Sequence, residues 1–186
     1  MATIDSIGLI EVSSVAMGYL VQNTMLKAAS VQLLLARSIC SGKFLIAVAG
    51  DVASVSAALD AGATQCNGTL IENKLISRLH PSVLPAISMA VACDPATIRS
   101  LGVIETFSAA SIVEAADAAL KSANVELLRL HLAMALGGKG FALIAGDVSS
   151  VEAAVAAGSQ AAATEGMLVG RGVIAAPEKE LFQEFI

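Results

Sequence analysis

The spacing of apolar and polar positions predicts alternating strands and helices. The first apolar run, Ile4 to Val12, is β-rich, and Ser13 or Ser14 then offers a hydroxyl that can cap a helix. Helical spacing is clearest later in the chain, where one face carries Ile112, Ala116, Ala119, Leu120 and Ala123. Another face carries Glu114, Asp117 and Lys121. Asp117 and Lys121 are four residues apart and form an i,i+4 ion pair in such a helix.

Two pairs of β-rich runs predict hairpins. Val31 to Ile39 and Phe44 to Ala49 enclose a short turn with a glycine, and Val125 to Met134 and Phe141 to Ala145 repeat the pattern. A further β-rich run completes each set, around Thr69 to Ile76 and around Met167 to Ile174.

Asp51 and Asp147 each follow a predicted strand and precede a helical pattern. A carboxylate at that point is a natural helix N-cap, and this is preferred over a catalytic role. The predicted apolar stripes are Val52, Val55 and Leu59 in the first helix and Val148, Val151 and Val155 in the second. Pro81 and Pro177 then open short helices.

The chain is a tandem repeat. Gly8-Leu9-Ile10-Glu11 recurs as Gly102-Val103-Ile104-Glu105, an offset of 102 − 8 = 94 residues. Ala-Gly-Asp-Val recurs around Asp51 and Asp147, an offset of 147 − 51 = 96 residues. Leu26 to Val31 matches Leu120 to Val125 at the offset of 94, and Lys43 matches Lys139 at the offset of 96, so the second copy gains two residues between Val125 and Lys139, in or next to its hairpin turn.

Each copy has the order β-α-β-β-α-β followed by a short tail. This is the split βαβ pattern of a ferredoxin-like fold, an α+β class in which each four-stranded antiparallel sheet is packed with helices. The boundaries predicted are a first domain over residues 1–90, a linker over 91–100 and a second domain over 101–186.

Composition and charge argue against several classes of protein. No run of about 20 apolar residues exists, so no spanning helix is expected, and the first residues lack the features of a secretory signal. A net charge of −5 without a basic, aromatic patch argues against nucleic acid. The apolar content of 56% suggests a surface buried by self-association in a cytoplasmic protein. Cys40, Cys66 and Cys93 are too widely spaced for a disulfide framework, and the last two are expected to be buried or idle.

The turn Ser38-Ile39-Cys40-Ser41-Gly42-Lys43-Phe44 is the candidate site. It holds a thiol, a glycine and a cation within four residues, and Lys43 can favour a thiolate. Its counterpart, Gly137-Gly138-Lys139-Gly140, has no cysteine and lacks the Ser or Thr of a phosphate-binding loop. From the residues alone, a lone cysteine here is more often an idle thiol than a metal ligand.

Three blocks resemble the bacterial microcompartment shell domain: Glu105 to Ser108, Ala115 to Val125, and Ala145 to Val151. The resemblance covers both copies and implies a shell protein that forms homotrimers imitating six-fold tiles, beside hexameric and trimeric neighbours. It implies that the turns Ser41-Gly42-Lys43 and Gly137-Gly138-Lys139 approach the central axis, and that Lys27 and Lys121 lie at the tile edge. The usual Pro-Arg-Pro edge motif is missing, since the chain has Leu79-His80-Pro81 and Ala175-Ala176-Pro177.

Ser38 to Phe44 and His80 to Ile87 are similar, within that family, to the iron–sulfur-binding tandem shell proteins of propanediol-utilisation compartments. That resemblance implies a 4Fe-4S cluster at the three-fold axis, with Cys40 as the metal ligand from each subunit. Ser41 stands where those relatives have proline, so a looser turn is expected. The cluster would pass electrons across the shell, with encapsulated redox enzymes as further partners.

Other readings stay open at this point. The Cys40 turns can instead line an open or gated metabolite pore without a cluster, or the centre can be inert. His80 and His131 are single histidines with no ligand partner in the sequence pattern, and a structural or exposed role is expected for both. No Ser/His/Asp arrangement, carboxylate pair or dinucleotide fingerprint is found, so the chain is not expected to be an enzyme.

Overall fold

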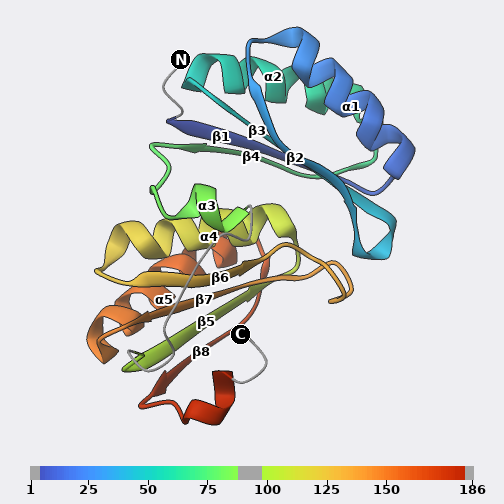
Figure 1. The fold of residues 1–186 in the computed structure, drawn as a ribbon. Coiled ribbons are helices and arrows are strands. Elements are labelled where there is room, and N and C mark those ends of the chain that lie inside the picture. The colour runs from blue at the N-terminus through green and yellow to red at the C-terminus, as the bar shows by residue number, and fades with distance from the viewer. Residues whose placement is uncertain (1–4, 88–97, 183–186) are drawn as a thin grey trace. The chain divides into compact units, whose positions relative to one another are not determined.

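The structure, a computed structural model, describes residues 5–87 and 98–182 and divides into two compact units (Figure 1). The units do not follow the halves of the sequence. The first comprises residues 1–79 together with 108–111 and 132–139, and the second comprises 80–107, 112–131 and 140–186. Two short segments of the second copy therefore belong to the unit built by the first.

The first unit has the predicted order of elements. They are β1 (Ser6–Val12), α1 (Val15–Ala28), β2 (Gln32–Ile39), the short turn η1 (Cys40–Gly42), β3 (Lys43–Gly50), α2 (Val52–Gln65) and β4 (Leu70–Ser77). The strands pair antiparallel in the order β2-β3-β1-β4. Both helices cover one face of this sheet (Figure 1). The ferredoxin-like layer predicted from the sequence is confirmed.

The second unit repeats this layer. Its elements are α3 (Val83–Ile87), β5 (Ser100–Thr106), α4 (Ala109–Ser122), β6 (Glu126–His131), β7 (Gly140–Gly146), α5 (Val148–Thr164), β8 (Leu168–Ala175) and the turn η3 (Lys179–Phe182). The antiparallel order β6-β7-β5-β8 matches that of the first sheet. The short helices after Pro81 and Pro177 are thus both present.

Small residues let the paired helices pack closely. A Cβ on Gly62 of α2 would lie 2.8 Å from Cγ of Met25 in α1. A Cβ on the equivalent Gly158 of α5 would lie 2.5 Å from the carbonyl oxygen of Ala115 in α4. Real Cβ contacts are not this short, so a side chain at Gly62 would force Met25 to shift, and one at Gly158 would clash with the backbone of Ala115. The core of the first unit is otherwise built from aliphatic side chains of β1, β3, α1 and α2 around Phe44.

Helix caps follow the sequence prediction in part. Ser14 is the N-cap of α1 and accepts from Met17 N, and Asp51 caps α2 by accepting from Ser54 N at 2.9 Å. The Ser54 N–H, and then its hydroxyl, hold the pKa of Asp51 below its usual value. Asp147 occupies the same position before α5 but makes no side-chain cap. It instead forms an ion pair with Arg99, with Nη1 3.0 Å from Oδ1.

Two other sequence predictions are wrong in detail. Strand β6 ends at His131 and not at Met134, because Ala133 adopts a φ of 57°, which breaks an extended strand. Val52 and Val148 were expected in the apolar stripes but are 42% and 40% exposed, since each is the first residue after its N-cap. Val55, Leu59, Val151 and Val155 are buried as predicted.

Cys93 and most of the predicted linker lie outside the described residues. In the described parts of the chain, no helix has the length and apolar character needed to cross a bilayer.

Candidate functional site

The Cys40 turn closes the hairpin of β2 and β3. Ile39 pairs with Lys43, so Cys40, Ser41 and Gly42 alone make the connection. Ser41 has a φ of 65° and Gly42 a φ of 71°. Two successive left-handed residues are typical of tight hairpin turns, and the second position suits glycine because it has no Cβ. The predicted hairpin is confirmed.

The loop that joins β6 to β7 packs against this turn within the first unit. Cys40 N donates to the carbonyl of Ala133 at 3.0 Å, and Ala135 N donates to Cys40 Sγ at 2.8 Å. Ala133, Ala135, Gly137 and Gly138 all have positive φ. The thiol of the first copy is therefore oriented by backbone groups of the second copy. The family resemblance implies that the two turns lie near one axis, but no pattern in the sequence indicates these hydrogen bonds.

Lys43 is held by a buried carboxylate. Its Nζ lies 2.8 Å from Oε1 of Glu11, which has no solvent exposure. Oε2 of the same carboxylate accepts from Ala109 N, the first residue of α4, at 2.9 Å. A Cβ on Gly138 would lie 3.2 Å from Lys43 Nζ, so the loop approaches the lysine closely at a residue without a side chain. Lys43 thus joins the hairpin to β1 and to the loop.

A second buried polar cluster lies beside Glu11 in the first unit. Glu72 of β4 accepts hydrogen bonds from the hydroxyls of Ser108 and Ser111, and Lys74 Nζ lies 3.6 Å from its Oε1. All four residues are buried. No motif in the sequence marks these four residues as a cluster. The available clue was that Glu72 and Lys74 alternate along a strand whose counterpart in the second copy has glycines.

Cys66, the other cysteine among the described residues, has a different environment from Cys40. Cys66 is buried, its Sγ donates to the carbonyl of Gly62 at 3.1 Å, and burial raises the pKa of its thiol. Cys40 is half-buried at the surface turn. Within the described residues, no group of three or more His, Cys, Asp or Glu side chains is placed to hold a metal ion. One chain therefore supplies one thiolate at this turn, and a cluster would need several copies.

The remaining residues singled out from the sequence are two lysines and two histidines. Lys27 is exposed in the last turn of α1, and Lys121 pairs with Asp117 on α4, as predicted. Asp117 is buried and also accepts from His80 N at 2.8 Å. His131 stacks on Phe141, with ring centroids 4.9 Å apart. Both histidines thus have hydrogen-bond or stacking partners within the second unit.

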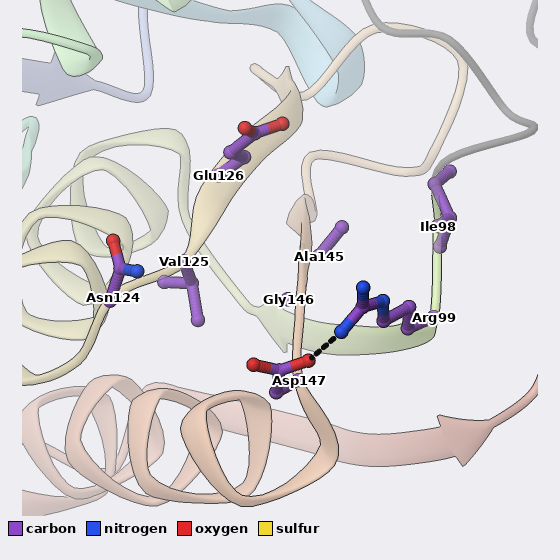
Figure 2. A pocket seen from close by; sticks show the side chains of 8 residues that line it. All are labelled: Ile98, Arg99, Asn124, Val125, Glu126, Ala145, Gly146 and Asp147. Atoms are coloured by element: carbon purple, nitrogen blue, oxygen red, sulfur yellow. Dashed lines mark hydrogen bonds and ion pairs between the residues drawn. The ribbon is translucent and has the colours of Figure 1, made fainter.

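One hollow of the second unit lies away from the Cys40 turn in the sequence and carries charged residues. It is lined by Ile98, Arg99, Asn124, Val125, Glu126, Ala145, Gly146 and Asp147. Figure 2 shows the Arg99–Asp147 ion pair at its side, with Glu126 pointing away from that pair. Both charges of the pair are mostly exposed and satisfy each other. The lining offers no arrangement of nucleophile and base.

The repeated fold and its sequence blocks define the class of protein. The BMC domain matches residues 6–79 and again 100–177, so the chain belongs to the BMC domain family, and it is a bacterial microcompartment shell protein with two such domains in tandem. The bacterial microcompartment shell protein PduT of Citrobacter freundii is 39% identical over 182 residues, which is 98% of each chain. The resemblance read from the sequence is thus confirmed.

Solved structures agree with this assignment. The crystal structure of a microcompartment protein from Desulfitobacterium hafniense superposes with a TM-score of 0.86 at 44% identity, covering 96% of this chain and 98% of that one. The shell protein EutM of Salmonella typhimurium is 38% identical over 88 residues, or 47% of this chain and 90% of its own. That span fits a single-domain relative matched by one of the two repeats.

Proposed function

We propose that this chain forms a homotrimeric shell tile in which three Cys40 thiolates, one from each copy, bind a 4Fe-4S cluster at the three-fold axis. Only the first repeat carries the thiol, so three chains present three equivalent sulfurs where a six-fold ring would present six. Iron–sulfur clusters are bound by cysteine thiolates. With three protein ligands, the fourth iron takes water or a small ligand.

The observation that carries this proposal is the hydrogen bond from Ala135 N to Cys40 Sγ, 2.8 Å long. Cluster sulfurs commonly accept such bonds, and these bonds tune the reduction potential and fix the ligand's direction. The donor comes from the loop of the other repeat, which carries the extra residues. The longer loop of the second repeat thus supplies the hydrogen-bond donor to the Cys40 thiol.

A cluster of this kind takes up and releases one electron at a time. In a tile beside hexameric and trimeric neighbours, it would carry electrons between the two faces of the shell. Encapsulated redox enzymes are the natural partners on the inner face. The chain itself supplies the thiolate, its hydrogen-bond donor and a turn fixed by Lys43 and Glu11.

Anaerobic purification followed by iron and sulfide analysis tests the proposal. We expect broad absorbance near ~400 nm and about four irons per three chains, both lost in Cys40→Ser. Cys66→Ser is the matched control, because that thiol is buried and bonded to Gly62, and it should keep its iron. Protein that stays free of iron after anaerobic reconstitution would favour a metabolite pore at these turns. A chain that is monomeric under all conditions would overturn the tile itself.

A further inference from the structure

The donor to the Cys40 thiol lies in an exposed stretch of the loop between β6 and β7. Residues 134–137 of this loop are exposed, whereas Ala133 before them and Gly138 after them are buried. Ala135 lies inside the exposed stretch, and its N–H donates to Cys40 Sγ at 2.8 Å. An exposed stretch of loop has few packing contacts that fix it. The position of this donor therefore depends on how the loop is held at its two buried ends.

The first buried end is held by the turn that carries the thiol. Ala133 has no solvent exposure, and its carbonyl oxygen accepts a hydrogen bond from Cys40 N at 3.0 Å. This bond anchors the loop two residues before Ala135. It does not fix the loop on the far side of Ala135, where the remaining exposed residues run on to Gly138.

The second buried end packs against the Lys43 side chain at Gly138. A Cβ on Gly138 would lie 3.2 Å from Lys43 Nζ, 3.3 Å from its Cε and 3.7 Å from the carbonyl oxygen of Cys40. The two shorter distances are tighter than most real Cβ contacts, so a side chain at this position would push either the lysine or the loop away. The missing side chain of Gly138 is what allows the loop to approach Lys43 and the turn this closely.

Lys43 is the partner less able to move. Its Nζ lies 2.8 Å from Oε1 of Glu11, whose carboxylate has no solvent exposure. Moving the cation away would leave a buried charge without its partner, which is energetically costly. The exposed stretch of the loop has no comparable restraint. A side chain at Gly138 is therefore expected to displace the loop, and with it the N–H of Ala135.

The neighbouring glycines do not share this contact. Gly137 and Gly42 also have positive φ, of 62° and 71°, yet a Cβ on either would meet no atom of the described residues within 4 Å. Gly42 is the counterpart of Gly138 in the first repeat, at the offset of 138 − 42 = 96 residues. The backbone conformation favours glycine at all three positions. Only at Gly138, among these three, does the glycine also make room for a neighbour.

We propose that Gly138 and Lys43 are positioning residues for the Cys40 thiol, because their close approach holds Ala135 N on Sγ. An N–H donor favours negative charge on the sulfur that it bonds. Hydrogen bonds to the ligating sulfurs also help to set the reduction potential of an iron–sulfur cluster. The redox consequence of this inference rests on the proposed function. The placement of the donor on the thiol does not, since both groups belong to one chain.

Gly138→Ala tests the contact. Gly137→Ala is the matched control, because it adds the same methyl group at positive φ without a neighbour among the described residues. Both variants should fold like the native chain by circular dichroism. In the full chain without metal, amide hydrogen exchange at Ala135 should be about fivefold to tenfold faster in Gly138→Ala than in the native chain, and unchanged in Gly137→Ala. Lys43→Met, which removes the ammonium group, should also speed this exchange.

The reconstituted protein gives the second readout. A redox titration followed by electron paramagnetic resonance should give Gly138→Ala a more negative reduction potential than the native and Gly137→Ala chains. The reason is that the reduced cluster carries the extra negative charge and loses the hydrogen bonds that stabilise it. A merely structural role for Gly138 would leave this potential unchanged.

The two readouts separate the possible failures. Exchange at Ala135 that is equal in Gly138→Ala and Gly137→Ala would overturn the positioning role, whether or not iron is bound. Faster exchange in Gly138→Ala together with a native potential would overturn its redox consequence. A native chain that takes up no iron would overturn the proposed function, and the exchange rates would still decide the positioning role.

Discussion

Lys43 of the candidate turn and Glu11 of β1 form a buried ion pair, with Nζ 2.8 Å from Oε1. The carboxylate has no solvent exposure and the lysine side chain is 17% exposed. Because the same carboxylate binds Ala109 N, one buried charge ties together the hairpin, the sheet and the start of α4. The lysine that the sequence analysis placed at the axis turn is thus also part of the unit's structural framework.

Breaking this pair should be costly. Lys43→Met leaves Glu11 buried with an uncompensated charge, so the free energy of unfolding should fall by about 3 kcal/mol. Urea unfolding followed by circular dichroism measures it. Arg99→Met is the matched control, because its pair with Asp147 is largely exposed and should contribute under about 1 kcal/mol. Equal losses in the two variants would contradict a framework role for Lys43.

The turn should reject proline at Ser41. Proline is confined to φ near about −65°, whereas Ser41 has a φ of 65°. Ser41→Pro should therefore lower the free energy of unfolding by more than about 1 kcal/mol, and Ser41→Gly should change it by less. Thermal unfolding of both variants checks this. A Ser41→Pro chain as stable as the native one would mean that the turn easily adopts another conformation.

Alkaline pH should weaken the fold through Cys66. Burial raises the pKa of its thiol, so above about pH 9 the unfolded chain loses this proton before the folded chain does. The unfolded state then binds fewer protons, and the free energy of unfolding falls as pH rises. Cys66→Ser removes this contribution. Urea unfolding at a series of pH values should show a steeper alkaline loss in the native chain than in the variant, and parallel curves would contradict the prediction.

Lys27 and Lys121, which the resemblance places at the tile edge, can be tested by variants that distinguish assembly of tiles from stability of the fold. Lys27 is exposed, so Lys27→Ala should change the free energy of unfolding by about 0.5 kcal/mol or less. Lys121→Ala should cost more, about 1 kcal/mol or more, because it leaves the buried Asp117 carboxylate without its cation. If both lie where tiles meet, the double variant keeps its trimer mass but no longer forms sheets visible by electron microscopy. Asp117→Ala, which removes a buried acceptor of His80 N, is the contrasting variant and should destabilise the fold. Normal sheets from the double variant would remove the lysines from the edge.

The elements of the fold were predictable because their causes are local. The spacing of apolar residues, the serine before α1 and the aspartate before α2 act over three or four residues, so the sequence states them directly. The tandem repeat strengthened these predictions, because an element predicted in one copy could be checked against the equivalent residues of the other copy. The position of Cys40 in a hairpin turn followed from the same short-range rules.

Other features depend on residues far apart in the chain, and the sequence did not reveal them. The bond from Ala135 N to Cys40 Sγ joins residues separated by 95 positions, and that from Ala109 N to Glu11 spans 98. The end of β6 at His131, and the pairing of Asp147 with Arg99 in place of a cap, likewise depend on neighbours that only packing brings together.

By itself, then, the sequence determined the two repeats, their strands and helices, and the place of one thiol in a turn. These features follow from the spacing of apolar residues, from helix N-cap residues and from the sequence repeat. The tertiary structure decided what surrounds that thiol and which helix the chain covers for itself. The apolar side chains of α4 are buried, whereas several of those on α1 are exposed to solvent. The burial of a helix depends on which other elements pack against it in the folded chain, and the local sequence pattern does not specify them.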